Sequence, residues 1–221
     1  MPSAAQADPP NPDRPARPTR VGIVLALVLA ATVLLLGLAV RGNPPPLDVA
    51  VGDALAAAFP TAATDLFNVT GTLPVFFLVG LAAAAVCWFQ GRRPIAAAFV
   101  LGLSGEVATT LVKVIVDRPR PPGASDIEAF VTAASYPSGH TVRIVVMAGL
   151  LVAAIAGRRS LARWLPIAAA IAWVILVGCA RIASREHWAT DVLGGWLLGA
   201  AWLSLCLAAE HTLRARRALS G

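Results

Sequence analysis

The run from Val21 to Val40 contains twenty consecutive residues without a charged side chain. A helix of that length is about 30 Å long, which matches the hydrocarbon core of a bilayer. The run is also too long for the apolar part of a signal peptide, so we expect it to stay in the protein as a first transmembrane helix. A chain with such a segment is expected to fold in a membrane.

The rest of the chain has the same apolar character. Hydrophobic residues make up 57% of the 221 residues and charged residues 14%, whereas soluble domains average about 45–50% and about 25%. The length leaves room for about six spans of about 20 residues each. We therefore predict an all-α integral membrane protein, a six-transmembrane-helix bundle with a short interfacial helix between the first two spans.

The bounds of the remaining elements follow from charges, prolines and glycines that interrupt the apolar runs. Between Arg41 and Gly71, three prolines precede a mixture of apolar residues and aspartates, which favours a helix at the membrane surface. In the last span, Gly195 and Gly199 share one helical face and would let a neighbouring helix approach closely. The spans after the first are predicted at 72–89, 95–116, 141–157, 164–180 and 188–209.

The placement of arginine predicts how the spans are oriented. The net charge of +6 comes mostly from arginine, with Lys113 as the only lysine. Most arginines outside the motifs described below lie at span ends on one side of the six-span layout, which is the cytoplasm by the positive-inside rule. We therefore expect a six-span domain over 20–212, between a disordered cytoplasmic tail (1–19) and a basic cytoplasmic tail (213–221). This distribution of charge favours a cell-membrane protein with no nucleic-acid partner.

The first of three polar clusters contains Lys113 and Arg120, and Pro121 follows them. Charge beside a membrane span is costly, which favours a functional role over an incidental one. A lysine offers a point charge, and an arginine offers a planar fork that grips two phosphate oxygens. The alternative is a pair of cations that extend to the membrane surface near a span end.

The second cluster, Pro137-Ser138-Gly139-His140, comes directly before the fourth span. Gly139 permits close backbone approach, and the amides that open the next helix would point at an anion, to which Ser138 adds a hydroxyl. His140 would then lie beside the bound group, where it can donate a proton. The alternative is a simple helix cap with a surface histidine.

The third cluster consists of Arg181, His187 and Asp191. On a helix, His187 and Asp191 would share a face, so that Asp191 could hold one ring nitrogen in its protonated form and leave the other free to attack. Arg181 would add a third cation, and the alternative is a surface His–Asp pair in a loop. Together the three clusters supply charge neutralisation, a nucleophile and an acid, which is what hydrolysis of a phosphoester needs.

The three clusters resemble the motifs of the type 2 phosphatidic acid phosphatase family, also called lipid phosphate phosphatases. The family pattern is Lys-x6-Arg-Pro, then Pro-Ser-Gly-His, then Ser-Arg-x5-His-x3-Asp. This chain has Lys113-x6-Arg120-Pro121, Pro137-Ser138-Gly139-His140 and Arg181-x5-His187-x3-Asp191.

The resemblance implies a role for each matching residue. His187 would be the nucleophile that forms a phosphohistidine, Asp191 would orient it, and His140 would protonate the leaving group. The phosphate would be bound by Lys113, Arg120, Ser138, Gly139 and Arg181. No metal or other cofactor is expected, and the three cysteines, Cys87, Cys179 and Cys206, lie in apolar runs without the spacing of a metal site.

Four residues near the motifs carry further expectations. Ala180 stands where the family usually has serine, which predicts one hydroxyl contact fewer and weaker phosphate binding. Arg185 is interpreted as an extra headgroup contact or an interfacial cation. Glu106 is expected to hydrogen-bond another helix or to help hold the cationic cluster, and Arg143 to touch a headgroup or extend outward.

From these patterns we expect a metal-independent phosphatase whose site lies at the outer face of the membrane. The leading substrate is a polyprenyl diphosphate of the undecaprenyl type. Phosphatidylglycerol phosphate, phosphatidic acid and prenyl sugar phosphates are alternatives. A protein of another class, one that only binds anionic lipid headgroups, is disfavoured by the presence of both histidines and Asp191.

Overall fold

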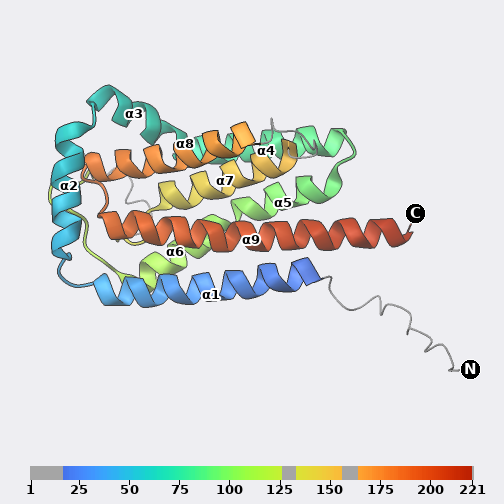
Figure 1. Ribbon diagram of the computed structural model, residues 1–221, viewed down its shortest axis with the longest axis horizontal. Coiled ribbons are helices and arrows are strands. Elements are labelled where there is room, and N and C mark those ends of the chain that lie inside the picture. Colours follow the sequence, from blue (N-terminus) through green and yellow to red (C-terminus); the bar gives the residue numbers. More distant parts are fainter. Residues whose placement is uncertain (1–16, 126–132, 156–163, 221) are drawn as a thin grey trace, which may run out of the picture.

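The computed structural model describes residues 17–125, 133–155 and 164–220, and within these ranges the chain forms helices and no strand. Most of the helices run along one axis, while α2 lies across one end of the bundle (Figure 1). The predicted all-α fold is confirmed. The helices are α1 (Arg17–Val40), α2 (Pro46–Ala58), α3 (Thr61–Thr70), α4 (Leu73–Phe89), α5 (Arg93–Leu103), α6 (Gly105–Val116), α7 (Gly139–Ile155), α8 (Trp164–Ala183) and α9 (Ala189–Ser220).

Four helical segments are long and apolar enough to cross a membrane on their own, namely α1, α5 joined to α6, α8 and α9. A fifth candidate is α4 together with α3, which are joined by a bend of 48°. The apolar helix α7 has 17 residues, and at about 1.5 Å per residue it is slightly shorter than the hydrocarbon core. The structure therefore supports a bundle with several spans, in which α7 is the short member.

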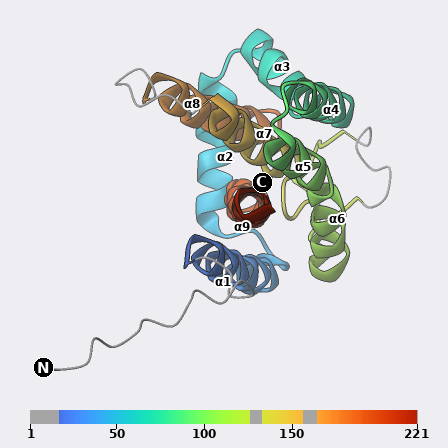
Figure 2. The ribbon, with the colours of Figure 1, turned by 90° about the vertical axis from the view of Figure 1, so that its right-hand side faces the viewer.

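Helix α9 lies at the centre of the bundle, with α1, α5 and α7 packed around it (Figure 2). Two glycines allow α7 to approach closely. Gly195 faces Ser138 and Thr141, and Gly199 faces Val145, at distances that leave no room for a side-chain carbon. The predicted use of these glycines as a close packing face is confirmed.

The outer surface of the bundle is apolar. Leucines such as Leu35, Leu78 and Leu165 are more than two-thirds exposed. Large exposed apolar areas are unfavourable in water but are covered by lipid chains in a bilayer. In the interior, Phe99 and Leu150 are fully buried where α5 and α7 meet.

The region between the first two spans differs from the sequence-based expectation. The expected interfacial helix is α2, which begins at Pro46, a position where proline's missing N–H has no cost. Helix α2 ends before Pro60, because a proline in the interior of a helix interrupts it. A second helix, α3, begins directly after Pro60. The single predicted helix is therefore two helices.

Both ends of the predicted six-span domain also differ. Helix α1 begins at Arg17, inside the segment predicted as a disordered tail, and residues 1–16 lie outside the described residues. Helix α9 continues to Ser220, through the predicted basic tail. Near that end of α9, Glu210 pairs with Arg214 one turn further on, and such pairs stabilise a helix.

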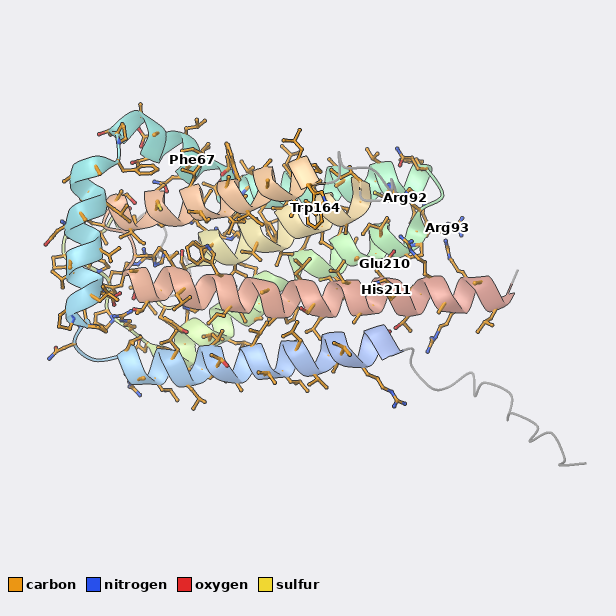
Figure 3. All side chains as sticks on the ribbon, in the orientation of Figure 1. Phe67, Arg92, Arg93, Trp164, Glu210 and His211 are labelled. Atoms are coloured by element: carbon orange, nitrogen blue, oxygen red, sulfur yellow. The ribbon has the colours of Figure 1, made fainter. Side chains whose placement is uncertain are left out.

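Arginines gather at one end of the bundle, and the three motifs lie at the other. Arg92, Arg93 and the last turns of α9 lie at the end where α1 begins, far from α2 (Figure 3). The arginines at positions 158, 159 and 163 lie outside the described residues. Helix α2 and the links that carry the three motifs occupy the other end (Figure 1).

Candidate active site

The three sequence motifs come from different elements and meet at the end of the bundle crossed by α2. The first motif begins on α6 and the second opens α7, while the third runs from α8 into α9. His140 lies close enough to Arg181 and His187 to interact with both electrostatically, and His187 interacts in the same way with Lys113 and Arg120. The predicted convergence of the motifs is thus present in the structure.

His187 lies in the short link between α8 and α9 and is 2% exposed. Its backbone N–H donates to the carbonyl of Arg181 at 3.2 Å, which ties the link to the end of α8. Burial lowers the pKa of His187 well below its usual value, and the cations Arg181, Lys113 and Arg120 lower it further. The ring is therefore neutral at pH 7, and a neutral imidazole has a lone pair available for attack.

Asp191 lies behind His187 in the first turn of α9. Its Oδ2 is 3.6 Å from Nδ1 of His187 and accepts the backbone N–H of Trp188 at 2.9 Å. The separation from His187 is longer than a hydrogen bond, as is common for catalytic pairs without substrate. The other oxygen, Oδ1, accepts from Arg118 at 2.6 Å. Asp191 therefore links His187 to the buried guanidinium of Arg118.

Arg118 and its partner Asp48 were not predicted as site residues. The guanidinium of Arg118 bridges Asp191 and Asp48, with the second pair at 2.8 Å, and both Arg118 and Asp48 are 1% exposed. Arg118 also donates to the hydroxyl of Thr190 at 2.6 Å. The available signal was weak, because Asp48 resembles a surface carboxylate of an interfacial helix. Arg118 lies beside Arg120 in a segment in which the arginines alternate with prolines.

The two predicted phosphate-binding arginines flank a carboxylate, Glu186, which sequence analysis also missed. Nη1 of Arg120 is 3.2 Å from Oε2 of Glu186, and Nη2 of Arg181 is 3.7 Å from the same oxygen. The other oxygen of Glu186 accepts the N–H of Ser125 at 3.0 Å. The third cation, Lys113, donates to the backbone carbonyl of Ala134 at 2.5 Å. Lys113, Arg120 and Arg181 therefore lie in one region, in which the carboxylate of Glu186 is close to both arginines.

The second motif forms the tight turn that opens α7. The N–H of Ser138 donates to the backbone carbonyl of Asp191 at 3.0 Å, which joins this turn to the start of α9. The hydroxyl of Ser138 is buried and has no hydrogen-bond partner within the described part of the chain, so it is available to a bound anion. A Cβ at Gly139 would lie 2.9 Å from Nη2 of Arg143, so a larger residue there would displace the end of the Arg143 side chain. His140 follows in the first turn and is 2% exposed.

Arg143 is placed differently from either alternative suggested by the sequence. Its Nε lies 2.8 Å from Oε2 of Glu106, and its Nη1 donates to the carbonyl of Gly71 at 2.7 Å. Arg143 is only 9% exposed, so it neither extends outward nor stands free for a headgroup. It fastens the end of α3 and the α6 residue Glu106 to α7 beside His140. The expectation that Glu106 bonds to another helix is confirmed.

The structure also places Arg185 and Ala180, the two other residues near the motifs with a sequence-based expectation. Arg185 makes a surface ion pair with Asp53 of α2 at 2.7 Å, the kind of pair that contributes about 0–1 kcal/mol. Arg185 has a positive φ of 59°, so the link between α8 and α9 turns sharply there. Ala180 is fully buried in α8.

A polar cavity of about 390 Å³ opens beside this cluster. Arg181 and Glu186 form part of its wall, while Thr64 and Asn68 of α3 line the opposite part. Among the described residues, no group of three or more histidine, cysteine, aspartate or glutamate side chains is arranged to hold a metal ion. The cations Lys113, Arg120 and Arg181, which lie near His187, suit the site to an anion.

Comparison with known proteins identifies the family. A family model described as the PAP2 superfamily matches residues 93–215, a range that includes all three motifs. The fold is similar to that in the crystal structure of "the first transmembrane PAP2 type phosphatidylglycerolphosphate phosphatase from Bacillus subtilis", with a TM-score of 0.62 and 22% identity, over 87% of this chain and 95% of that chain. No curated protein sequence matches the chain. Because the family model spans more than half of its length, the chain belongs to the PAP2 superfamily, that of the type 2 phosphatidic acid phosphatases, and is a multi-pass membrane phosphatase.

Proposed function

We propose that the protein hydrolyses a lipid phosphate or diphosphate at the outer face of the cell membrane through a phosphohistidine on His187. The observation that carries the proposal is the position of this neutral, buried imidazole among Lys113, Arg120 and Arg181, with Asp191 behind it. A phosphomonoester carries about two negative charges at neutral pH, and the three cations offset them.

The geometry supports a two-step reaction. In the first step, the ring nitrogen of His187 that does not face Asp191 bonds to phosphorus while the bond from phosphorus to the ester oxygen breaks, and His140 gives a proton to that oxygen. In the second step, the oxygen of a water molecule bonds to phosphorus while the bond from phosphorus to His187 breaks, one proton of the water passes to His140, and inorganic phosphate is released. Asp191 stabilises the positive imidazole that forms in the first step.

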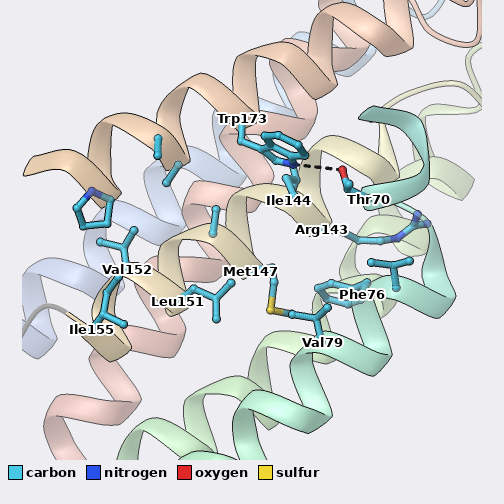
Figure 4. Close-up of a pocket in the computed structure, with 15 residues that line it drawn as sticks. Thr70, Phe76, Val79, Arg143, Ile144, Met147, Leu151, Val152, Ile155 and Trp173 are labelled. Carbon is cyan, nitrogen blue, oxygen red and sulfur yellow. Dashed lines mark hydrogen bonds between the residues drawn. The ribbon is translucent and has the colours of Figure 1, made fainter. Parts of the chain in front are cut away.

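An apolar groove supports a substrate with a lipid chain. It has a volume of about 480 Å³ and runs along α7 between α4 and α8. Thr70 and Arg143 lie at one end and Ile155 at the other, with Trp173 donating to the hydroxyl of Thr70 at 3.2 Å (Figure 4). Arg143 is one turn past His140, so a chain in the groove would enter from the side of the proposed site.

Among lipid phosphates, a polyprenyl diphosphate of the undecaprenyl type is our leading candidate. Phosphatidylglycerol phosphate is the second, because the structurally similar Bacillus subtilis protein is described as a phosphatidylglycerolphosphate phosphatase. Phosphatidic acid and prenyl sugar phosphates share the same phosphate chemistry.

The orientation that we propose follows from charge. Arg92, Arg93 and the arginines of the last turns of α9 lie at the end of the bundle opposite the site (Figure 3). The positive-inside rule assigns that end, with both termini, to the cytoplasm. The site then opens outside the cytoplasm, at the level of the lipid headgroups.

Phosphate release from a panel of lipid phosphates by the purified protein in detergent tests the proposal. We expect activity in EDTA, loss of activity in His187→Ala, and wild-type activity in the control His211→Ala, which changes a histidine at the opposite end of the bundle. Turnover in His187→Ala would refute the assigned nucleophile. Lipid binding without phosphate release by the wild type would favour a protein that only binds headgroups.

A further inference from the structure

A buried charge cluster joins the interfacial helix α2 to the proposed nucleophile. It consists of Asp48 on α2, Arg118 after α6, and Asp191 on α9, and all three side chains are 0–1% exposed. Arg118 lies 2.8 Å from Asp48 and 2.6 Å from Asp191. The ring of His187 is next in line, 3.6 Å from Asp191.

Asp48 is held more firmly than an ion pair alone would require. Its Oδ1 accepts the backbone N–H of Thr190 at 2.8 Å, and its Oδ2 accepts the hydroxyl of Thr190 at 2.6 Å as well as Arg118. These bonds reach from α2 to the first turn of α9, which also carries Asp191. Burying a carboxylate is unfavourable unless it is paired and hydrogen-bonded, and Asp48 meets both conditions.

The charge balance of the cluster points to a role in the chemistry. A buried Arg118–Asp191 pair would be neutral on its own and would do little to stabilise a positive imidazole on His187. With Asp48 included, two carboxylates share one guanidinium, so the cluster has one more negative than positive charge. That surplus lies behind Asp191, the carboxylate that faces His187, and His187 is the group that becomes positive when it bonds to phosphorus.

We propose that Asp48 and Arg118 are positioning residues that act on His187 through Asp191. Arg118 holds Oδ1 of Asp191 so that Oδ2 faces the ring, and Asp48 shares the charge of Arg118 so that Asp191 remains a strong acceptor. The inference rests on the proposed function, and it makes α2 a part of the site rather than only a surface helix.

Two variants of Asp48, one that removes its charge and one that changes the length of its side chain, test the inference. Asp48→Asn keeps the shape and can still accept from Thr190 but removes the charge, whereas Asp48→Glu keeps the charge and changes the length. We expect kcat to fall about 10- to 100-fold in Asp48→Asn, the loss typical of residues that orient a functional histidine, and to fall less in Asp48→Glu. KM and the affinity for vanadate, used as a phosphate analogue, should stay within about twofold in both, because neither change touches the three phosphate-binding cations.

The control is Asp53→Asn, which removes a carboxylate of the same helix whose partner is the surface residue Arg185. It should have wild-type kcat. A kcat in Asp48→Asn equal to or above that of Asp48→Glu would overturn the inference. So would a loss in KM and vanadate affinity with kcat unchanged.

Two further measurements separate this inference from folding and from the proposed function. Rates are expressed per folded molecule, from size-exclusion chromatography and tryptophan fluorescence, and Arg118→Lys replaces Asp48→Asn if the latter does not fold. A lysine keeps the charge but lacks the planar fork with which Arg118 contacts both carboxylates, so the same loss of kcat is expected and a wild-type kcat would overturn the inference. Activity in His187→Ala would refute the proposed function, whereas an inactive His187→Ala beside a fully active Asp48→Asn would refute only the role of the cluster.

Discussion

The close approach of α7 and α9 at Gly195 is the contact that holds the Pro-Ser-Gly-His turn against the start of α9. A methyl group at Gly195 would place Cβ 1.9 Å from Oγ1 of Thr141 and 2.6 Å from the carbonyl oxygen of Ser138. The threonine hydroxyl can rotate away, at the cost of its 2.9 Å bond to Ser138, which contributes about 1 kcal/mol. The carbonyl is backbone and cannot rotate away.

These distances give the displacement of the Ser138 carbonyl that a methyl group at position 195 would require. A carbon and a carbonyl oxygen rest at about 3.3 Å, so the Ser138 carbonyl must retreat by roughly 0.7 Å from its position 2.6 Å from the new Cβ. Because Ser138 and His140 share one short turn, the proton donor moves with it. Overpacking of this kind costs about 1–3 kcal/mol of stability, and a shift on the order of 1 Å at a site can cost about 100-fold in rate.

We therefore expect Gly195→Ala to unfold at a lower temperature in detergent and to lose about 10- to 100-fold in kcat. Thermal unfolding and phosphate release measure the two effects. The matched control is Gly22→Ala, whose Cβ would lie 3.3 Å from Ala208 and Ser204 on another side of α9, a contact that small adjustments accommodate. A Gly195→Ala variant with wild-type melting and kcat would show that α7 and α9 are further apart than described.

Three other predictions concern the charges of the site and its side of the membrane. Since burial lowers the pKa of His187, its ring should stay neutral at pH 6, where an ordinary histidine of pKa about 6.5 is mostly protonated; an NMR titration with a midpoint near 6.5 would contradict this. Glu186→Gln removes the carboxylate that competes for the two phosphate-binding arginines, so inorganic phosphate should inhibit at about fivefold lower concentration, equivalent to about 1 kcal/mol, and an unchanged inhibition constant would count against that competition. In a background without native cysteines, Ser125→Cys should react with an impermeant thiol reagent on intact cells and Ala218→Cys should not, and the reverse pattern would overturn the proposed orientation.

Local patterns in the sequence were sufficient for the spans and for the residues of the three motifs. The apolar runs are long and contain few charges, so their lengths indicate helices that cross a membrane. The motif residues carry charge next to those runs, where an incidental charge is costly. The spacing of Gly195 and Gly199 likewise predicted one packing face, because residues four apart lie on the same side of a helix.

The residues that sequence analysis missed are those whose partners lie far away in the chain. Asp48 is separated from Thr190 by 142 positions and from Arg118 by 70. In an interfacial helix, an aspartate is normally a solvated residue, and nothing in the local pattern distinguishes Asp48 from Asp53. Glu186 presented the same difficulty, because its position between two arginines depends on how the link between α8 and α9 turns.

The sequence by itself determined that this chain is a helical membrane protein that carries the three charged motifs of its family, since hydropathy and motif spacing are local properties. Only the tertiary structure decided which charges are buried together. A carboxylate such as Asp48 becomes part of the site when α2 closes over the ends of α8 and α9, and burial in that contact makes a solvated side chain a strongly interacting one.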